Sequence, residues 1–151
     1  MFRPTITEDV MQMAPNVRAE DEGEVRSVTG LSAFQALTIG LFHSSDCVTG
    51  VGAEGELVCI AGVVPTGTAG SVWMISTPDI SRYKREVVVE GRQWIAEMTE
   101  KHGTLQNVVD ATNRIHRVLI KHMGFEFSDP IENYGVGKIT VVPFKRKQKH
   151  V

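Results

Sequence analysis

The chain has 151 residues, of which 42% are hydrophobic and 23% charged, and its formal net charge is −2. This length favours one domain with a hydrophobic core of its own, and both fractions are ordinary for a soluble globular protein. No apolar run approaches the roughly 20 residues of a membrane-spanning helix, and the N-terminus lacks the basic and apolar segments of a secretion signal.

In the first half of the chain, apolar periodicity and turn residues predict a strand, three helices and three more strands. The strand covers 2–6, and a helix that begins at Thr7 ends before Pro15. A second helix covers 18–28. A third follows the capping-box pattern of Ser32 and Gln35, and its predicted core stripe is Phe34, Leu37 and Leu41. The strands are expected over 47–53, 56–65 and 71–77.

In the second half, the longest helix is expected over 81–101, and a buried strand over 105–109 precedes a second helix. That helix begins near Asn113, places Ile115, Val118, Leu119 and His122 on one face, and ends at Gly124 as a left-handed cap. Strands at 125–127 and 138–144 follow, with a loop between them. Strand, helix and strand around 110–127 predict a mixed sheet with a helix on its face.

Charge is distributed unevenly along the chain. Residues 1–80 carry three Arg and ten Asp or Glu, whereas residues 81–151 carry 13 Lys or Arg and eight acids. We predict one domain over 1–144 and a basic tail over 145–151, whose cations are Lys145, Arg146, Lys147 and Lys149. The polarity favours an oriented partner surface and the tail a weak DNA contact, although a solvated face is the common explanation.

Two cysteines, Cys47 and Cys59, lie in strand-like surroundings. In a domain of this size they predict reduced, half-buried thiols and neither a disulfide framework nor a metal site.

The stretch "TLQNVVDATNRIHRVLIKHMGFEF" carries a family resemblance. Asn113, Leu119 and Gly124-Phe125 resemble the last motif of the GNAT (GCN5-related) N-acetyltransferases, in which an Asn opens a helix beside the cofactor. The stretch is most similar to the GNAT-like internal virion proteins of short-tailed phages. The resemblance implies an α/β (α+β) fold with a mixed, mostly antiparallel sheet of about seven strands and helices on both faces.

The family's acetyl-CoA site implies candidate cofactor residues. In the family, the turn after the fourth strand carries Gln or Arg, two residues, then Gly-x-Gly or Gly-x-Ala, because backbone N–H groups must approach the pyrophosphate. Those positions fall here on Ser81, Lys84 and Glu86. Arg82, Lys84 and Arg85 are candidates to bind phosphate through their side chains, and the alternative is a solvated basic turn. Asn113 is a cofactor candidate or a helix cap.

The catalytic groups of the family are harder to place. Its proton-donating tyrosine falls on Ile120, and residues 71–77 contain no carboxylate to act as a base. Asp110 is the remaining candidate base, with helix capping as the alternative. His116 matches a histidine of the phage family and is a second weak candidate, with packing as the alternative.

These substitutions predict a GNAT-fold phage protein that has lost catalysis, uses no cofactor and serves in the virion, in assembly or genome delivery. The expected partners are virion or host proteins. The expected locations are the host cytoplasm and then the phage particle. The alternative is an acetyl-CoA-dependent N-acetyltransferase with a divergent cofactor site that acts on a host protein. A nucleic-acid-binding module is a third hypothesis and depends on the basic tail alone.

Overall fold

A computed structural model of the protein describes residues 1–149. Its strands form one eight-stranded sheet in the order β1-β2-β3-β4-β5-β8-β6, with β7 paired to β8. The strands are β1 (Phe2–Pro4), β2 (Asp46–Val51), β3 (Leu57–Pro65), β4 (Gly70–Ser76), β5 (Thr104–Asp110), β6 (Glu126–Phe127), β7 (Ile131–Tyr134) and β8 (Ile139–Lys147). Neighbouring strands are antiparallel except β4 and β5, which are parallel. The predicted mixed sheet is confirmed, and β7 adds a strand where a loop was expected.

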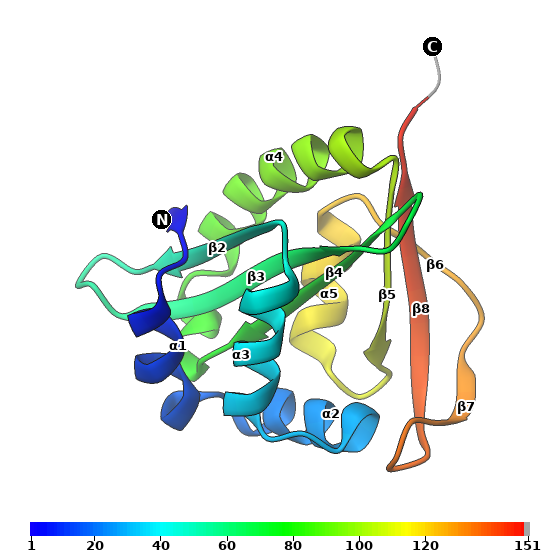
Figure 1. The fold of residues 1–151 in the computed structure, drawn as a ribbon, viewed down its shortest axis with the longest axis horizontal. Helices are drawn as coiled ribbons and strands as arrows, with labels where there is room; N and C mark the ends of the chain where they lie inside the picture. Colours follow the sequence, from blue (N-terminus) through cyan, green and yellow to red (C-terminus); the bar gives the residue numbers. More distant parts are fainter. Residues whose placement is uncertain (150–151) are drawn as a thin grey trace.

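Helices cover both faces of the sheet, as predicted (Figure 1). They are α1 (Thr7–Met13), α2 (Ala19–Thr29), α3 (Ala33–His43), α4 (Lys84–His102) and α5 (Arg114–His122), with 3₁₀ turns η1 (Ala14–Asn16) and η2 (Pro78–Arg82). The helices α1, α2 and α3 lie on one face, and α4 and α5 lie on the other. No single helix in residues 1–149 is long and apolar enough to cross a membrane, although α2 and α3, bent by 73°, pass that test together.

Each face of the sheet has its own hydrophobic core. Under α1 and α3 the core contains Val10, Met13, Leu37, Leu57, Ile60 and Ile75. The larger core, under α4 and α5, includes Ile80, Val87, Ile95, Leu105, Leu119 and Phe144. Ser32 and Gln35 form the predicted capping box at the start of α3. Phe34 is 52% exposed, so its predicted place in the core is wrong. Ala33 and Leu37 are buried and Leu41 packs against them partly buried, whereas Phe34, 100° around the helix from Ala33, lies at the border of this stripe.

The last strand continues past the predicted boundary at residue 144. Lys145, Arg146 and Lys147 belong to β8 and pair with Gln106, Leu105 and Thr104 of β5. The predicted basic tail over 145–151 is therefore partly a strand, because alternating residues pair along β5 whatever the charge of their exposed side chains. Residues 150–151 of that tail lie outside the described residues.

Helix α5 ends as the sequence indicates, and its buried face only partly matches the predicted one. Leu119 is buried and Ile115 packs against the core, as predicted, but Val118 and His122 are exposed and His116 and Met123 are buried in their place. The φ angle of Gly124 is 89°, which confirms the left-handed cap. Phe125 is buried and packs edge-on against Phe144 at 5.1 Å between ring centroids.

Gly124→Val is expected to lower the free energy of unfolding by about 1–2 kcal/mol, because a residue with a Cβ is strained at this φ angle. Gly23→Ala is expected to change the free energy of unfolding in the opposite direction. Gly23 lies inside α2 where an added Cβ meets nothing within 4 Å, so it should stabilise by about 0.5–1 kcal/mol. Urea denaturation measures both values. Equal stability of the two variants would contradict the cap.

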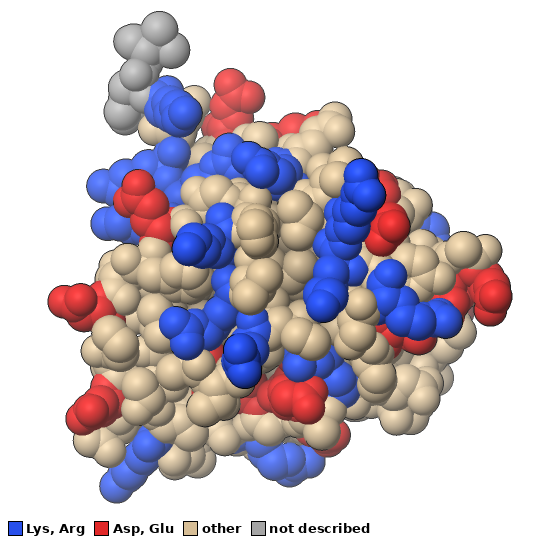
Figure 2. Space-filling model, turned by 180° about the vertical axis from the view of Figure 1, so that it is seen from behind, with Lys and Arg blue, Asp and Glu red and all other residues tan. Residues whose placement is uncertain are grey.

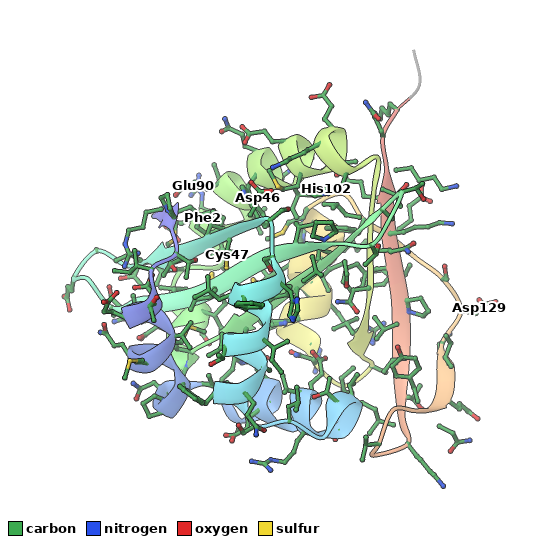
Figure 3. The ribbon with its side chains drawn as sticks, in the orientation of Figure 1. Phe2, Asp46, Cys47, Glu90, His102 and Asp129 are labelled. Carbon is green, nitrogen blue, oxygen red and sulfur yellow. The ribbon has the colours of Figure 1, made fainter. Side chains whose placement is uncertain are left out.

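Polar contacts fasten the N-terminal strands to α4. The Phe2 N–H donates to Glu90 Oε1 at 3.1 Å. Asp46, at the start of β2, accepts from Lys101 Nζ at 2.7 Å and lies 3.8 Å from His102 Nε2. Figure 3 shows both groups, Phe2 near Glu90 and Asp46 near His102. The edge β1-β2 is therefore held against the first and last parts of α4.

The strands β4 and β5 separate soon after they begin. Their register contains only Gly70 with Leu105 and Ser71 with Gln106. Beyond these pairs the two strands diverge toward their carboxyl ends, and α2 crosses the open end of the resulting V (Figure 1). Diverging parallel strands leave backbone groups without a strand partner, which makes this gap a candidate binding site.

Candidate functional site

A cavity of about 450 Å³ occupies the gap between β4 and β5. Val28 of α2, Ile39 of α3 and Trp73 of β4 line it on one face of the sheet. Trp94 of α4 and Met123 after α5 line it on the other. The cavity therefore passes through the sheet and is mostly apolar, which are properties of a small-molecule site.

The edge of β4 that faces the cavity has one position without a partner. Asn107 Nδ2 of β5 donates to the Val72 carbonyl at 2.7 Å, and both backbone groups of Ser76 are bonded to α2. Because alternate residues direct their backbone groups to the same edge, those of Met74 also face the gap. Among residues 1–149 they have no hydrogen-bond partner. A ligand with amide groups could pair with β4 there.

A buried polar cluster closes the open end of the V. We define it as Arg18, Asp21, Ser76, Asn113 and His116, all at most 7% exposed. Asp21 Oδ1 accepts from Arg18 Nη1 at 2.6 Å and from Asn113 Nδ2 at 3.1 Å, and its Oδ2 accepts from the Ser76 N–H at 2.7 Å. His116 Nε2 lies 3.2 Å from Asp21 Oδ2 and 3.0 Å from Ser76 Oγ. The cluster thus joins α2, β4 and α5.

Asp21 is charged within this cluster. Burial raises the pKa of its carboxyl, but the hydrogen bond from His116, the charges of His116 and Arg18, and the Ser76 N–H outweigh burial and lower it. A buried carboxylate that is paired and fully hydrogen-bonded remains ionised. Asp21 therefore positions its neighbours and has no oxygen left for a substrate.

Glu24 lies one turn further along α2 and lines the cavity. Its pKa is shifted in the direction opposite to that of Asp21. Its Oε1 accepts from the Asp110 N–H at 2.6 Å. Burial raises the pKa of this carboxyl above its usual value, and that hydrogen bond and the charge of His116 offset only part of the effect. A half-buried carboxylate with a raised pKa in a cleft is suited to general-base work.

Glu24 was not predicted from the sequence, because the family's base often lies on the central strands and Glu24 lies on α2. A signal was nevertheless present. Asp21 and Glu24 lie three residues apart, so both carboxylates fall on one face of α2. Within the cluster of acids at the start of α2 they face inward, whereas Glu20 and Glu22 remain outside the core.

Three predicted site residues fall near the cavity, in other roles. Asp110 caps its own turn, since Oδ1 accepts from the N–H and hydroxyl of Thr112 at 2.9 and 2.8 Å. Asn113 occupies the N-cap position of α5 but makes no capping bond, because its side chain bonds Arg18 and Asp21 instead. His116, a candidate catalytic residue with packing as the alternative, is 3% exposed, and its Nε2 is engaged within the polar cluster by Asp21 and Ser76.

The predicted phosphate turn is divided between two elements. Ser81 and Arg82 lie in η2, and α4 begins at Lys84. Arg82 Nη2 is 2.7 Å from Glu56 Oε2 and 3.3 Å from Asp79 Oδ1, so its charge is already paired. Lys84 and Arg85 are exposed in the first turn of α4.

The first turn of α4 has the properties of an anion site. The first N–H that bonds inside the helix is that of Val87, to the Tyr83 carbonyl, so the N–H groups of Lys84, Arg85 and Glu86 precede the helical ladder. These donors and the positive end of the helix dipole favour a phosphate, whereas the Glu86 carboxylate opposes it.

Positive charge is concentrated on the face that carries α4 and α5 (Figure 2). The exposed cations of the two helices are Lys84, Arg85, Arg92, Lys101, Arg114, Arg117 and Lys121. Helix α5 contains no acidic residue, and its three cations give it a local charge of +3. This face would attract a ligand with several phosphates.

The two cysteines are separate thiols in the structure. Burial raises the pKa of the Cys59 thiol to about 12, so this group is protonated at neutral pH and unreactive. Residues 1–149 contain no group of three or more metal-ligating side chains that could hold an ion.

The sequence matches no family model and no curated protein. Solved structures do match its fold. The ribosomal-protein-S18-alanine N-acetyltransferase of Escherichia coli has a TM-score of 0.70 at 14% identity, over 100% of this chain and 95% of that one. A GCN5-related N-acetyltransferase of Kribbella flavida gives 0.71 at 17% identity, over 98% and 97%. The chain has the GNAT fold. A phosphinothricin acetyltransferase of Sinorhizobium meliloti, solved with acetyl-CoA, scores 0.67 at 12% identity over 97% and 87%.

Acetyl-CoA is bound in the Sinorhizobium meliloti structure, and two features of this chain would fit a ligand of that kind. The free backbone edge of Met74 and the apolar gap suit an extended arm that contains amides. The first turn of α4, with Lys84 and Arg85, suits a pyrophosphate. Glu86 is the one side chain of that turn that opposes it. The more specific resemblance to phage internal virion proteins stays a prediction from the sequence.

Proposed function

We propose that this protein is an acetyl-CoA-dependent N-acetyltransferase, the function considered second from the sequence. The observation that carries the proposal is Glu24: a half-buried carboxylate with a raised pKa that lines a cavity running through the gap between β4 and β5. Keeping a half-buried carboxylate beside a mostly apolar cavity costs desolvation energy, and this cost supports a role for Glu24 at the site.

When bound, acetyl-CoA would supply an acetyl group activated as a thioester. The residues of this chain would do the rest. Met74 would hold the extended arm by its backbone groups, and Lys84 and Arg85 would hold the phosphates. Glu24 would take a proton from the acceptor's ammonium group at Oε2, because Oε1 already accepts from the Asp110 N–H. The neutral amine could then attack the acetyl carbon.

The proton donor for the departing thiolate is the weak part of the site. Ile120 lines the cavity at the position that matches the family tyrosine, and it has no proton to give. His116 Nε2 is engaged by Asp21 and Ser76. Turnover is therefore expected to be slow relative to an enzyme that has the tyrosine.

Titration calorimetry with acetyl-CoA tests the proposal. Micromolar binding is expected, and the double variant Lys84→Ala with Arg85→Ala should bind about 10- to 100-fold more weakly, since each charged contact to phosphate contributes about 1.5–3 kcal/mol in a well-formed site and less at an exposed one. Arg92→Ala, an exposed cation further along α4, is the matched control and should bind as the parent does. Absence of binding by the parent chain would overturn the proposal.

A second candidate is the non-catalytic virion role predicted from the sequence. Two observations oppose cofactor binding, on which the acetyltransferase depends: Arg82 is paired with acids, and both backbone groups of Ser76 are bonded to Arg18 and Asp21, so neither residue is free for a ligand at the end of β4. The virion role predicts a different experimental outcome from the acetyltransferase. The chain would bind no acetyl-CoA and would be found in purified phage particles by mass spectrometry. A host-protein partner and a weak DNA contact through the basic tail are likewise proposals that rest on the sequence alone.

A further inference from the structure

The half of the cavity on the α2 and α3 face has apolar walls. We call it the acceptor half and define it by Val25, Val28, Ala36, Ile39 and Trp73, which line the cavity on that face. It lies on the side of the sheet opposite α4 and α5, where the phosphate-binding groups lie. A molecule in this half would therefore meet the other half of the cavity only through the gap between β4 and β5.

The indole of Trp73 is a fixed wall of the acceptor half. It lies against two glycines, and a Cβ at Gly40 of α3 or Gly62 of β3 would come within 2.7 or 2.8 Å of its ring. Its Nε1 donates to Ser44 Oγ at 2.9 Å. The glycines let both backbones approach the ring, and the hydrogen bond fixes its orientation, so the ring is held in place before a ligand arrives.

Acidic side chains are nearly absent from the walls. Among the described residues that line the cavity, Glu24 is the only Asp or Glu, and the cavity contains no Lys or Arg. A polyamine has several ammonium groups, and each would need a carboxylate or water. One carboxylate beside apolar walls instead matches a single ammonium group attached to an apolar body.

From this arrangement we infer that the acceptor half selects primary amines that carry one charge and an aromatic or aliphatic group. The ammonium would lie at Glu24, and the apolar group would lie between Trp73 and the side chains of Val28 and Ile39. The role of such an amine as an acetyl acceptor rests on the proposed function. Its binding depends only on the cavity.

The test uses the tryptophans as separate probes. Trp73 lines the acceptor half and Trp94 lines the other half, and they are the chain's two tryptophans. In Trp94→Phe, saturable change of the Trp73 emission is expected with 2-phenylethylamine and none with spermidine. With the series from butylamine to heptylamine, the Kd should fall about fourfold per added methylene, since each buried CH₂ contributes that factor. A flat series, or tighter binding of spermidine, would overturn the inference.

A pair of variants localises the binding. Val28→Asn makes one wall polar at nearly constant size and should raise the Kd of 2-phenylethylamine about tenfold. Val89→Asn makes the same change at a residue of α4 that is 63% exposed, and it should leave the Kd unchanged. Equal Kd values for the two variants would contradict binding in the acceptor half. The methylene series needs neither variant, so misfolding of one would not remove the test.

Acetyl-CoA is titrated separately into Trp73→Phe, with Trp94 as the probe. Binding of acetyl-CoA together with a flat amine series would leave the acetyltransferase standing and overturn the amine preference. If apolar amines bind but acetyl-CoA does not, the amine preference would stand and the proposed acetyltransferase function would be overturned.

Discussion

Glu24→Gln is expected to reduce kcat for acetyl transfer by about 10²–10⁴-fold, the range that a general base contributes. Gln has nearly the same shape and can still accept the Asp110 N–H at its Oε1, but it cannot take a proton from an amine. Binding of acetyl-CoA should stay within about twofold of the parent value, because the phosphate contacts lie on α4. Steady-state kinetics and calorimetry on the same preparations measure both quantities.

The pH dependence gives this prediction a second readout. Since burial raises the pKa of Glu24 when the chain is folded, the folded state favours the protonated carboxyl. This group therefore destabilises the fold as pH rises from its unfolded pKa through its raised folded pKa, and the cost persists above it. Glu24→Gln should be more stable than the parent at pH 7 and equally stable at acidic pH. The kcat/KM of the parent should rise with pH across the same window.

Glu22→Gln is the matched control. Glu22 is on the same helix, is 46% exposed and forms an exposed pair with Arg26 at 3.6 Å. Its substitution should leave kcat and stability nearly unchanged, because exposed pairs contribute about 0–1 kcal/mol. Parent-like turnover in Glu24→Gln would exclude Glu24 as the base.

Asp21→Asn should lower the free energy of unfolding at pH 7 by about 3–5 kcal/mol, the cost of removing one partner of a buried ion pair. The variant leaves Arg18, 7% exposed, without its buried carboxylate, and presents an NH₂ group to donors that need an acceptor. For a chain of this size the expected fall in Tm is roughly 6–20 °C. Urea denaturation and thermal melts followed by circular dichroism measure the two values.

Acid should erase the difference between this variant and the parent. The pKa of Asp21 is lowered in the folded chain, so its contribution to stability is present above its unfolded pKa and is lost as pH falls through the lowered folded pKa. Glu20→Gln is the control, because Glu20 pairs with the same guanidinium at 3.0 Å but is 57% exposed. A loss as large for Glu20→Gln as for Asp21→Asn would show that burial is not the cause.

Local signals were sufficient to predict most of the fold. The capping box at Ser32, the left-handed Gly124 and the period-two strands are determined by residues within a few positions of one another. Phe34 and Val118 show where this reasoning fails. Periodicity identifies an apolar stripe, but which side of a helix faces the sheet depends on the partner surface, and both residues lie next to the buried stripe and are exposed. The strand at Lys145 to Lys147 was missed because pairing with β5 is a long-range interaction.

The candidate site was harder to predict, for a related reason. Asn113 and His116 were identified as candidates, but their partners Arg18 and Asp21 lie more than 90 positions away, and a carboxylate at that distance gives no local pattern. Asp110 was assigned as a candidate base on its position at a strand end. In the structure the Asp110 N–H donates a hydrogen bond to Glu24. The proposed base, Glu24, is therefore a direct hydrogen-bond partner of the residue predicted as the base.

The polar cluster also has a consequence for the kinetics of folding. Its two hydrogen bonds to Asn113, from Arg18 and Asp21, and the neighbouring bond from Asp110 to Glu24 connect residues 86–95 positions apart. The two strands at the centre of the sheet share only two residue pairs. Long loops are closed late in folding, and desolvated charges are aligned only when both partners are in place. We therefore expect kinetic φ values, the share of a residue's stabilisation already present in the folding transition state, near zero at Arg18 and Asp21. Their substitution should accelerate unfolding and hardly change the folding rate.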